Sequence, residues 1–220
     1  MRGDMAIYVH GLWLSGRESL FLRRRLEAEF GLTVHRFRYP TVSSRMLDVA
    51  ERLDAFVREL GPRRVHFIGH SLGGLVIYRF LERFPEQPPG SVVFLGTPSV
   101  ECRAAMRAGR MSWAAKLLGS AIAEELLERR ERQWRVGRPL GIIAGTRPMG
   151  LGQFFASFDE ECDGTVGVSE TKLPGATDHI TLPVSHMGML LSARVAKQVG
   201  RFLEDGHFAL DEHPGPSKTI

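Results

Sequence analysis

The sequence is poor in cysteine: its 220 residues contain only Cys102 and Cys162. Two thiols are too few for a disulfide-rich scaffold or for a structural zinc module built on cysteine. The two could pair with each other, but such scarcity is typical of incidental thiols in a reducing compartment. We therefore expect a cytoplasmic protein that is held together by its apolar core.

Long apolar runs are also missing. No segment approaches the roughly 18 consecutive apolar residues that a membrane-spanning helix needs, so stable membrane insertion is excluded. The apolar stretch 5–9 follows Arg2 and superficially resembles a signal peptide. However, Asp4 occupies what would be the basic region, and His10 and Gly11 end the apolar stretch. We expect the mature chain to begin at or near Met1.

Lysine is scarce as well: only four of the 29 basic residues are lysines. The formal net charge of the chain is +4. Acidic residues interleave with the arginine clusters at 23–25 and 129–130, a mixture typical of a solvated helix face. No nucleic-acid-binding motif accompanies these clusters, so nucleic acid is not an expected partner. With 43% hydrophobic and 25% charged residues, the chain has the composition of one globular domain.

Short apolar runs alternate with amphipathic stretches along the chain. Strands are expected at 6–9, 33–39, 65–68, 91–95, 140–144 and 180–184, and helices at 17–30, 46–60, 75–84 and 189–202. This order predicts a three-layer α/β fold, in which a mostly parallel sheet of about six strands has helices on both faces. Right-handed crossovers then place the carboxyl ends of the strands along one edge of the sheet.

Two segments depart from this alternation. Residues 99–138 contain no convincing strand, but they include an apolar helical stretch, 111–127, which predicts a small helical lid inserted over the sheet. The segment 206–220, with Pro214-Gly215-Pro216, predicts a loosely ordered tail. The globular domain is therefore expected to span residues 1–205.

The most informative motif is Gly69-His70-Ser71-Leu72-Gly73, which fits G-x-S-x-G. It lies between an expected strand and an expected helix, which is the strand–turn–helix setting of a nucleophile elbow. Such a turn strains the backbone of the serine and exposes its hydroxyl above the carboxyl edge of the sheet. Ser71 is therefore the candidate nucleophile, and His70 is expected to point away from its hydroxyl.

A serine hydroxyl needs a base, and the chain offers eight histidines. His186 follows the last expected strand and so lies on the same edge as Ser71. His179 lies at the start of that strand, about 20 Å away at the opposite edge. His10 also follows a strand and is the main rival, but we assign it to holding its own loop. His66 lies within a strand and His70 inside the elbow, and the histidines without a matching position are His35, His207 and His213.

The base in turn needs a carboxylate that fixes its tautomer. Asp163 is the best candidate, because it lies in the turn sequence Asp163-Gly164-Thr165-Val166 and gives the chain order serine, aspartate, histidine. Several acids remain alternatives: Asp159, Glu160, Glu161 and Asp178.

Negative charge that develops on the substrate oxygen needs fixed hydrogen-bond donors. The backbone N–H of Leu72, directly after the candidate nucleophile, supplies one. The second is expected from Leu12, in the loop His10-Gly11-Leu12-Trp13 after the first strand, where Gly11 permits a tight turn.

Together these residues resemble the α/β-hydrolase superfamily, and most closely its small bacterial esterase- and lipase-like members. The motifs that carry the resemblance are His10-Gly11-Leu12-Trp13, Gly69-His70-Ser71-Leu72-Gly73-Gly74, Gly96-Thr97-Pro98, Asp163-Gly164-Thr165-Val166 and Ser185-His186-Met187-Gly188-Met189. The resemblance implies ester hydrolysis without a cofactor or metal, with Ser71, Asp163 and His186 as the catalytic triad and Leu12 and Leu72 as oxyanion donors. The chain departs from the family in that its two leading strands are missing and its oxyanion loop has a single glycine.

The expected substrate is a small-molecule or lipid ester. Apolar residues that flank the motifs are the candidates for its pocket: Trp13, Trp113, Leu117, Phe154, Phe155 and Met187. Because a fold does not determine a reaction, an acyltransferase or thioesterase that uses the same triad is an alternative, as is a non-catalytic binding module. The sequence does not indicate an oligomeric state.

Overall fold

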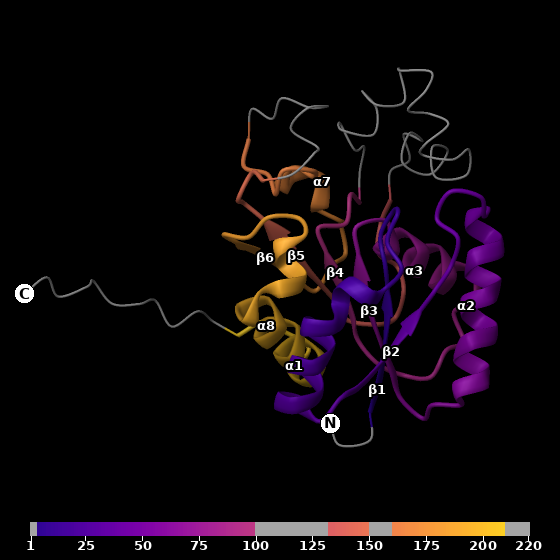
Figure 1. Ribbon diagram of the computed structural model, residues 1–220. Coiled ribbons are helices and arrows are strands. Elements are labelled where there is room, and N and C mark those ends of the chain that lie inside the picture. The colour runs from indigo at the N-terminus through magenta and orange to yellow at the C-terminus, as the bar shows by residue number, and fades with distance from the viewer. Residues whose placement is uncertain (1–3, 100–131, 150–159, 210–220) are drawn as a thin grey trace, which may run out of the picture.

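The computed structural model describes residues 4–99, 132–149 and 160–209, and Figure 1 shows a single sheet with helices packed on both faces. The six strands are β1 (Met5–Val9), β2 (Thr33–Phe37), β3 (Val65–His70), β4 (Val92–Leu95), β5 (Leu140–Gly145) and β6 (Asp178–Leu182). All neighbouring strands pair in parallel, in the order β2-β1-β3-β4-β5-β6. The predicted parallel sheet of six strands is confirmed.

Alternation along the strands divides the core into two layers. On β1, Ile7 and Val9 face the layer under α2 (Met46–Leu60) and α3 (Leu72–Arg83). Ala6 and Tyr8 face the layer under α1 (Leu20–Phe30) and α8 (Ala193–Asp205). Figure 1 shows these helix pairs on opposite sides of the sheet. Strands buried on both faces need apolar residues at nearly every position, which is why β1, β4 and β5 appear in the sequence as nearly continuous apolar runs.

Shorter elements complete the described fold. They are the 3₁₀ helices η1 (Arg17–Ser19) and η3 (Gly188–Leu191) and the short helix α7 (Val168–Thr171). No helix among the described residues is both long and apolar enough to cross a membrane.

The last helix is Ala193–Asp205 rather than the predicted 189–202, and the last strand is Asp178–Leu182 rather than the predicted 180–184. Pro183 has no N–H to donate to the ladder, so the strand stops before it. His186 therefore follows a short loop rather than the strand directly. At the other edge, β2 ends at Phe37 and not at Tyr39, because Tyr39 turns back to stack on His10.

The expected lid and tail lie largely outside the described residues. Of the 99–138 insertion, the structure describes only Ser99 and residues 132–138. The start of the expected tail is fixed to the core, because Phe208 is buried against Phe202 and the Ala209 N–H donates to Gln198 Oε1 at 2.9 Å. Residues 210–220 lie outside the described part.

Candidate active site

Ser71 occupies a strained turn between β3 and α3. Its φ is 54° and its ψ is −125°, a conformation that L residues rarely adopt. The turn exists because its neighbours are glycines: a Cβ on Gly73 would lie 2.0 Å from the Val9 carbonyl oxygen, and one on Gly74 would lie 2.1 Å from Thr97 Oγ1. The Ser71 N–H donates to the Leu95 carbonyl at 2.9 Å, which ties the elbow to β4.

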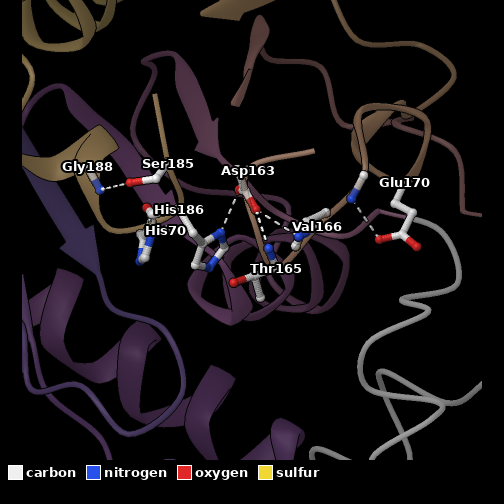
Figure 2. Close-up of polar contacts among 9 residues, drawn as sticks. His70, Asp163, Thr165, Val166, Glu170, Ser185, His186 and Gly188 are labelled. Carbon is white, nitrogen blue, oxygen red and sulfur yellow. Dashed lines mark hydrogen bonds and ion pairs between the residues drawn. The ribbon is translucent and has the colours of Figure 1, made fainter. Parts of the chain in front are cut away.

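Asp163 and His186 form a buried pair, drawn in Figure 2. The His186 Nδ1 lies 2.6 Å from Asp163 Oδ2, and the His186 N–H donates to the Asp163 carbonyl at 2.9 Å. Only 1% of Asp163 and 8% of His186 is exposed. The other carboxylate oxygen, Oδ1, accepts the N–H groups of Thr165 and Val166, each at 2.8 Å. An ionised Asp163 therefore holds the His186 ring with its proton on Nδ1 and its Nε2 free to accept a proton.

The alternative acids that the structure describes do not reach this histidine. Glu160 accepts hydrogen bonds from the Ser169 side chain and backbone. Asp178 begins β6 and accepts the N–H groups of His179 and Phe208. Asp159 lies outside the described residues.

Ser71 lies on the same edge as the pair. Gly96 packs between Ser71 and the pair. It follows Leu95, whose carbonyl accepts the Ser71 N–H. A Cβ on Gly96 would lie 3.1 Å from His186 Nδ1 and 2.8 Å from Asp163 Oδ2. Among the described residues, no hydrogen bond joins Ser71 Oγ to His186 Nε2. Such bonds are often long in substrate-free enzymes and tighten when substrate binds.

The loop after β1 lies against Ser71. A Cβ on Gly11 would be 2.9 Å from Ser71 Cβ, so only glycine allows this approach. His10 holds the loop: its Nδ1 bonds the Gly11 carbonyl at 3.0 Å, its Nε2 accepts the Tyr39 N–H at 3.4 Å, and its own carbonyl accepts the Tyr39 hydroxyl at 2.8 Å. Burial lowers the pKa of His10. A neutral His10 with both ring nitrogens engaged is not available as a base.

Leu12 and Leu72 have backbone N–H groups that donate to no acceptor among the described residues. Leu72 is the first residue of α3, where an N–H has no partner within the helix, and the helix dipole favours negative charge there. Both groups flank the Ser71 elbow, so both are candidate oxyanion donors.

The remaining candidates are distributed as follows. His179 hydrogen-bonds Thr171 Oγ1 at 2.9 Å, far from the elbow in the fold. Trp13 and Met187 flank the site and are 60% and 43% exposed. The other expected pocket residues, Trp113, Leu117, Phe154 and Phe155, lie outside the described residues. Gly96 and His70 lie in two of the motifs found in the sequence, but their contacts with His186 were not predicted, because those contacts join residues far apart in the sequence.

For the ester hydrolysis that the sequence predicts, replacing Gly11 with alanine is expected to lower kcat/KM about 100-fold. The new methyl group collides with Ser71 Cβ and displaces the loop or the nucleophile, and an error of about 1 Å in such a site has this cost. Steady-state kinetics and thermal unfolding measure the effect. Gly137→Ala is the control, because a Cβ there meets nothing within 4 Å. Equal kinetics in the two variants would contradict the tight approach of the loop.

Comparisons with known proteins agree with this architecture. The lipase BlEst2 of Bacillus licheniformis, in its mature form, is 20% identical, with a TM-score of 0.72, over 94% of this chain and 93% of that one. The RedJ thioesterase of Streptomyces coelicolor is 14% identical, with a TM-score of 0.58, over 90% and 85%. The phospholipase PlaB of Legionella pneumophila is 17% identical, with a TM-score of 0.59, over 77% of this chain and only 44% of that longer chain.

Identities this low show a shared fold and not a shared substrate. No curated protein matches the sequence. The family model described as "Alpha/beta hydrolase family" matches residues 6–216, nearly the whole chain. The chain therefore belongs to the alpha/beta hydrolase family, as its motifs predicted.

Proposed function

We propose that this protein is a cofactor-independent serine hydrolase that cleaves carboxylic esters through an acyl-enzyme. The buried Asp163–His186 pair, on the same edge of the sheet as the strained Ser71, is the observation that carries the proposal. A carboxylate that is hydrogen-bonded to an imidazole near a strained serine turn is the arrangement needed to activate a hydroxyl.

In the proposed reaction, Ser71 Oγ attacks the ester carbonyl while His186 Nε2 accepts the hydroxyl proton. The resulting oxyanion accepts hydrogen bonds from the Leu12 and Leu72 N–H groups. The tetrahedral adduct then expels the alcohol, which takes the proton from His186, and leaves an acyl group on Ser71. Water repeats the sequence with His186 as base, releasing the carboxylic acid and restoring the serine. Rotation of the Ser71 side chain toward His186 on substrate binding closes the missing hydrogen bond.

The distribution of exposed apolar side chains supports an apolar acyl group. In the part of the chain that the structure describes, the exposed large apolar residues are Trp13, Leu20, Phe21, Val42, Leu47, Met149, Met187 and Leu191. Each lies in a loop after the carboxyl end of a strand or in the helical turn that follows such a loop. In a parallel sheet these positions share the catalytic edge. Exposed apolar surface concentrated at one place is typical of a binding region.

A fluorophosphonate probe and a series of p-nitrophenyl esters test the proposal. We expect covalent labelling at Ser71, and hydrolysis whose kcat/KM increases from the acetyl ester to longer acyl chains, because the rim is apolar. Heat-denatured protein controls for nonspecific labelling. Absence of both labelling and turnover in folded protein would refute the proposal.

The same assay separates the related activities. An acyl thioester substrate tests for thioesterase activity, and an added alcohol tests for acyl transfer. A hydrolase forms the same fraction of free acid whatever the alcohol concentration, whereas an acyltransferase diverts product to the new ester. A cytoplasmic location remains a prediction from the cysteine content.

A further inference from the structure

We propose that His70 is a positioning residue, which holds the backbone of the base by donating a hydrogen bond from its Nε2–H to the His186 carbonyl. The inference rests on the proposed function, because it concerns the placement of the base in that reaction.

The contact joins β3, the strand that leads into Ser71, to the 183–187 loop, which carries His186. His70 is the last residue of β3 and is fully buried, and its Nε2 lies 3.0 Å from the His186 carbonyl oxygen. Figure 2 shows His70 beside His186. A carbonyl only accepts hydrogen bonds, so His70 must carry its proton on Nε2. The two imidazole rings have centroids 4.7 Å apart.

His186 is thereby held at three points. Its N–H donates to the Asp163 carbonyl, its ring Nδ1 bonds Asp163 Oδ2, and its own carbonyl accepts from His70. Of these three contacts, only the last is a hydrogen bond to the covalent neighbour of Ser71. Without it, the 183–187 loop keeps its bonds to Asp163 and to the Arg147 N–H, but it loses its hydrogen bond to the residue next to Ser71. Small displacements between reacting groups are costly, so this contact has a direct effect on rate.

The environment keeps His70 neutral. Burial and then the nearby His186 lower the pKa of His70 to about 3. Asp163 favours the charged form of His70, whereas His10 opposes it. A neutral ring suits the positioning role, because a second cation beside His186 would oppose the imidazolium that forms during the reaction. The His70 Nδ1 is buried and has no partner among the described residues, so the Nε2–H bond is the polar contact that fixes this ring.

Three substitutions separate positioning from general stability. His70→Leu removes the donor, whereas His70→Gln places an amide N–H at a similar reach. His66→Leu is the matched control: His66 is buried on the same strand and makes one hydrogen bond, to the Ser91 N–H, at the opposite edge of the sheet. We expect His70→Leu to lower kcat about 10- to 100-fold with KM changed less than about threefold. His70→Gln is expected to recover most of kcat, and His66→Leu to lower the melting temperature without lowering kcat.

If His70→Leu keeps wild-type kcat, or if His70→Gln is no better than His70→Leu, the positioning role is wrong. Wild-type labelling of Ser71 and ester turnover in the same experiment show that the proposed function itself still holds. Nitrogen-15 NMR of the imidazoles in the wild-type protein gives a test that no folding defect can obscure. We expect His70 as the neutral Nε2–H tautomer with no titration between pH 8 and 5, and an Nδ1–H tautomer would overturn the inference.

Discussion

Replacing Ser71 with alanine is expected to lower kcat/KM for ester hydrolysis by about 10⁴- to 10⁶-fold, the largest effect of any single substitution in this chain. In the proposed mechanism, alanine removes the one atom that forms the acyl bond, while the elbow, the candidate oxyanion N–H groups and the Asp163–His186 pair stay in place. The residual rate is what those groups supply to a direct attack by water. Initial-rate kinetics on the best ester of the chain-length series measure the loss.

The Ser71→Ala effect needs a control for the loss of any serine hydroxyl. Ser169 is exposed, hydrogen-bonds only Glu160 through its side chain, and lies in α7, so Ser169→Ala is expected to retain wild-type kinetics. The fluorophosphonate probe must label Ser169→Ala and must not label Ser71→Ala. Substantial hydrolysis by purified Ser71→Ala would place the nucleophile elsewhere and contradict the proposed mechanism.

The fold was predictable because the four central strands are buried on both faces and so have a strong apolar signal. The runs at 65–68 and 140–144 correspond to β3 and β5, which are fully buried. The last strand was shifted by two residues because it is an edge strand with exposed positions, where the apolar signal is weak. The segment 111–127 lies outside the described residues, so the predicted lid stays a prediction.

The residues of the candidate site that lie in a local motif could be predicted from the sequence. The contacts between residues far apart in the chain could not. Ser71 follows from a five-residue pattern, and Asp163 from chain order and a turn sequence. The bond from His70 to His186 joins residues 116 positions apart, and no local pattern marks it. Gly96 lies in the motif Gly96-Thr97-Pro98, but its contact with the site is also long-range: its φ is 55°, and a Cβ on it would collide with Asp163 and His186.

Replacing Asp163 with asparagine is expected to lower kcat about 10⁴-fold while the fold stays intact. The reason lies in how the amide must orient. The Thr165 and Val166 N–H groups both donate to Oδ1, so an asparagine must keep its oxygen there. Its NH₂ group then occupies the position of Oδ2, facing His186 Nδ1. A donor at that point forces the imidazole proton onto Nε2, the atom that has to accept the serine proton.

Asp178→Asn is the matched control for this change. Asp178 also accepts two backbone N–H groups, from His179 and Phe208, but it begins β6 and lies at the opposite edge of the sheet. We expect Asp163→Asn alone to lose activity, and nitrogen-15 NMR to show His186 switched from the Nδ1–H to the Nε2–H tautomer. Wild-type kcat in Asp163→Asn would mean that the carboxylate does not set the tautomer of the base. A large loss without the tautomer switch would point instead to the missing negative charge beside the imidazolium.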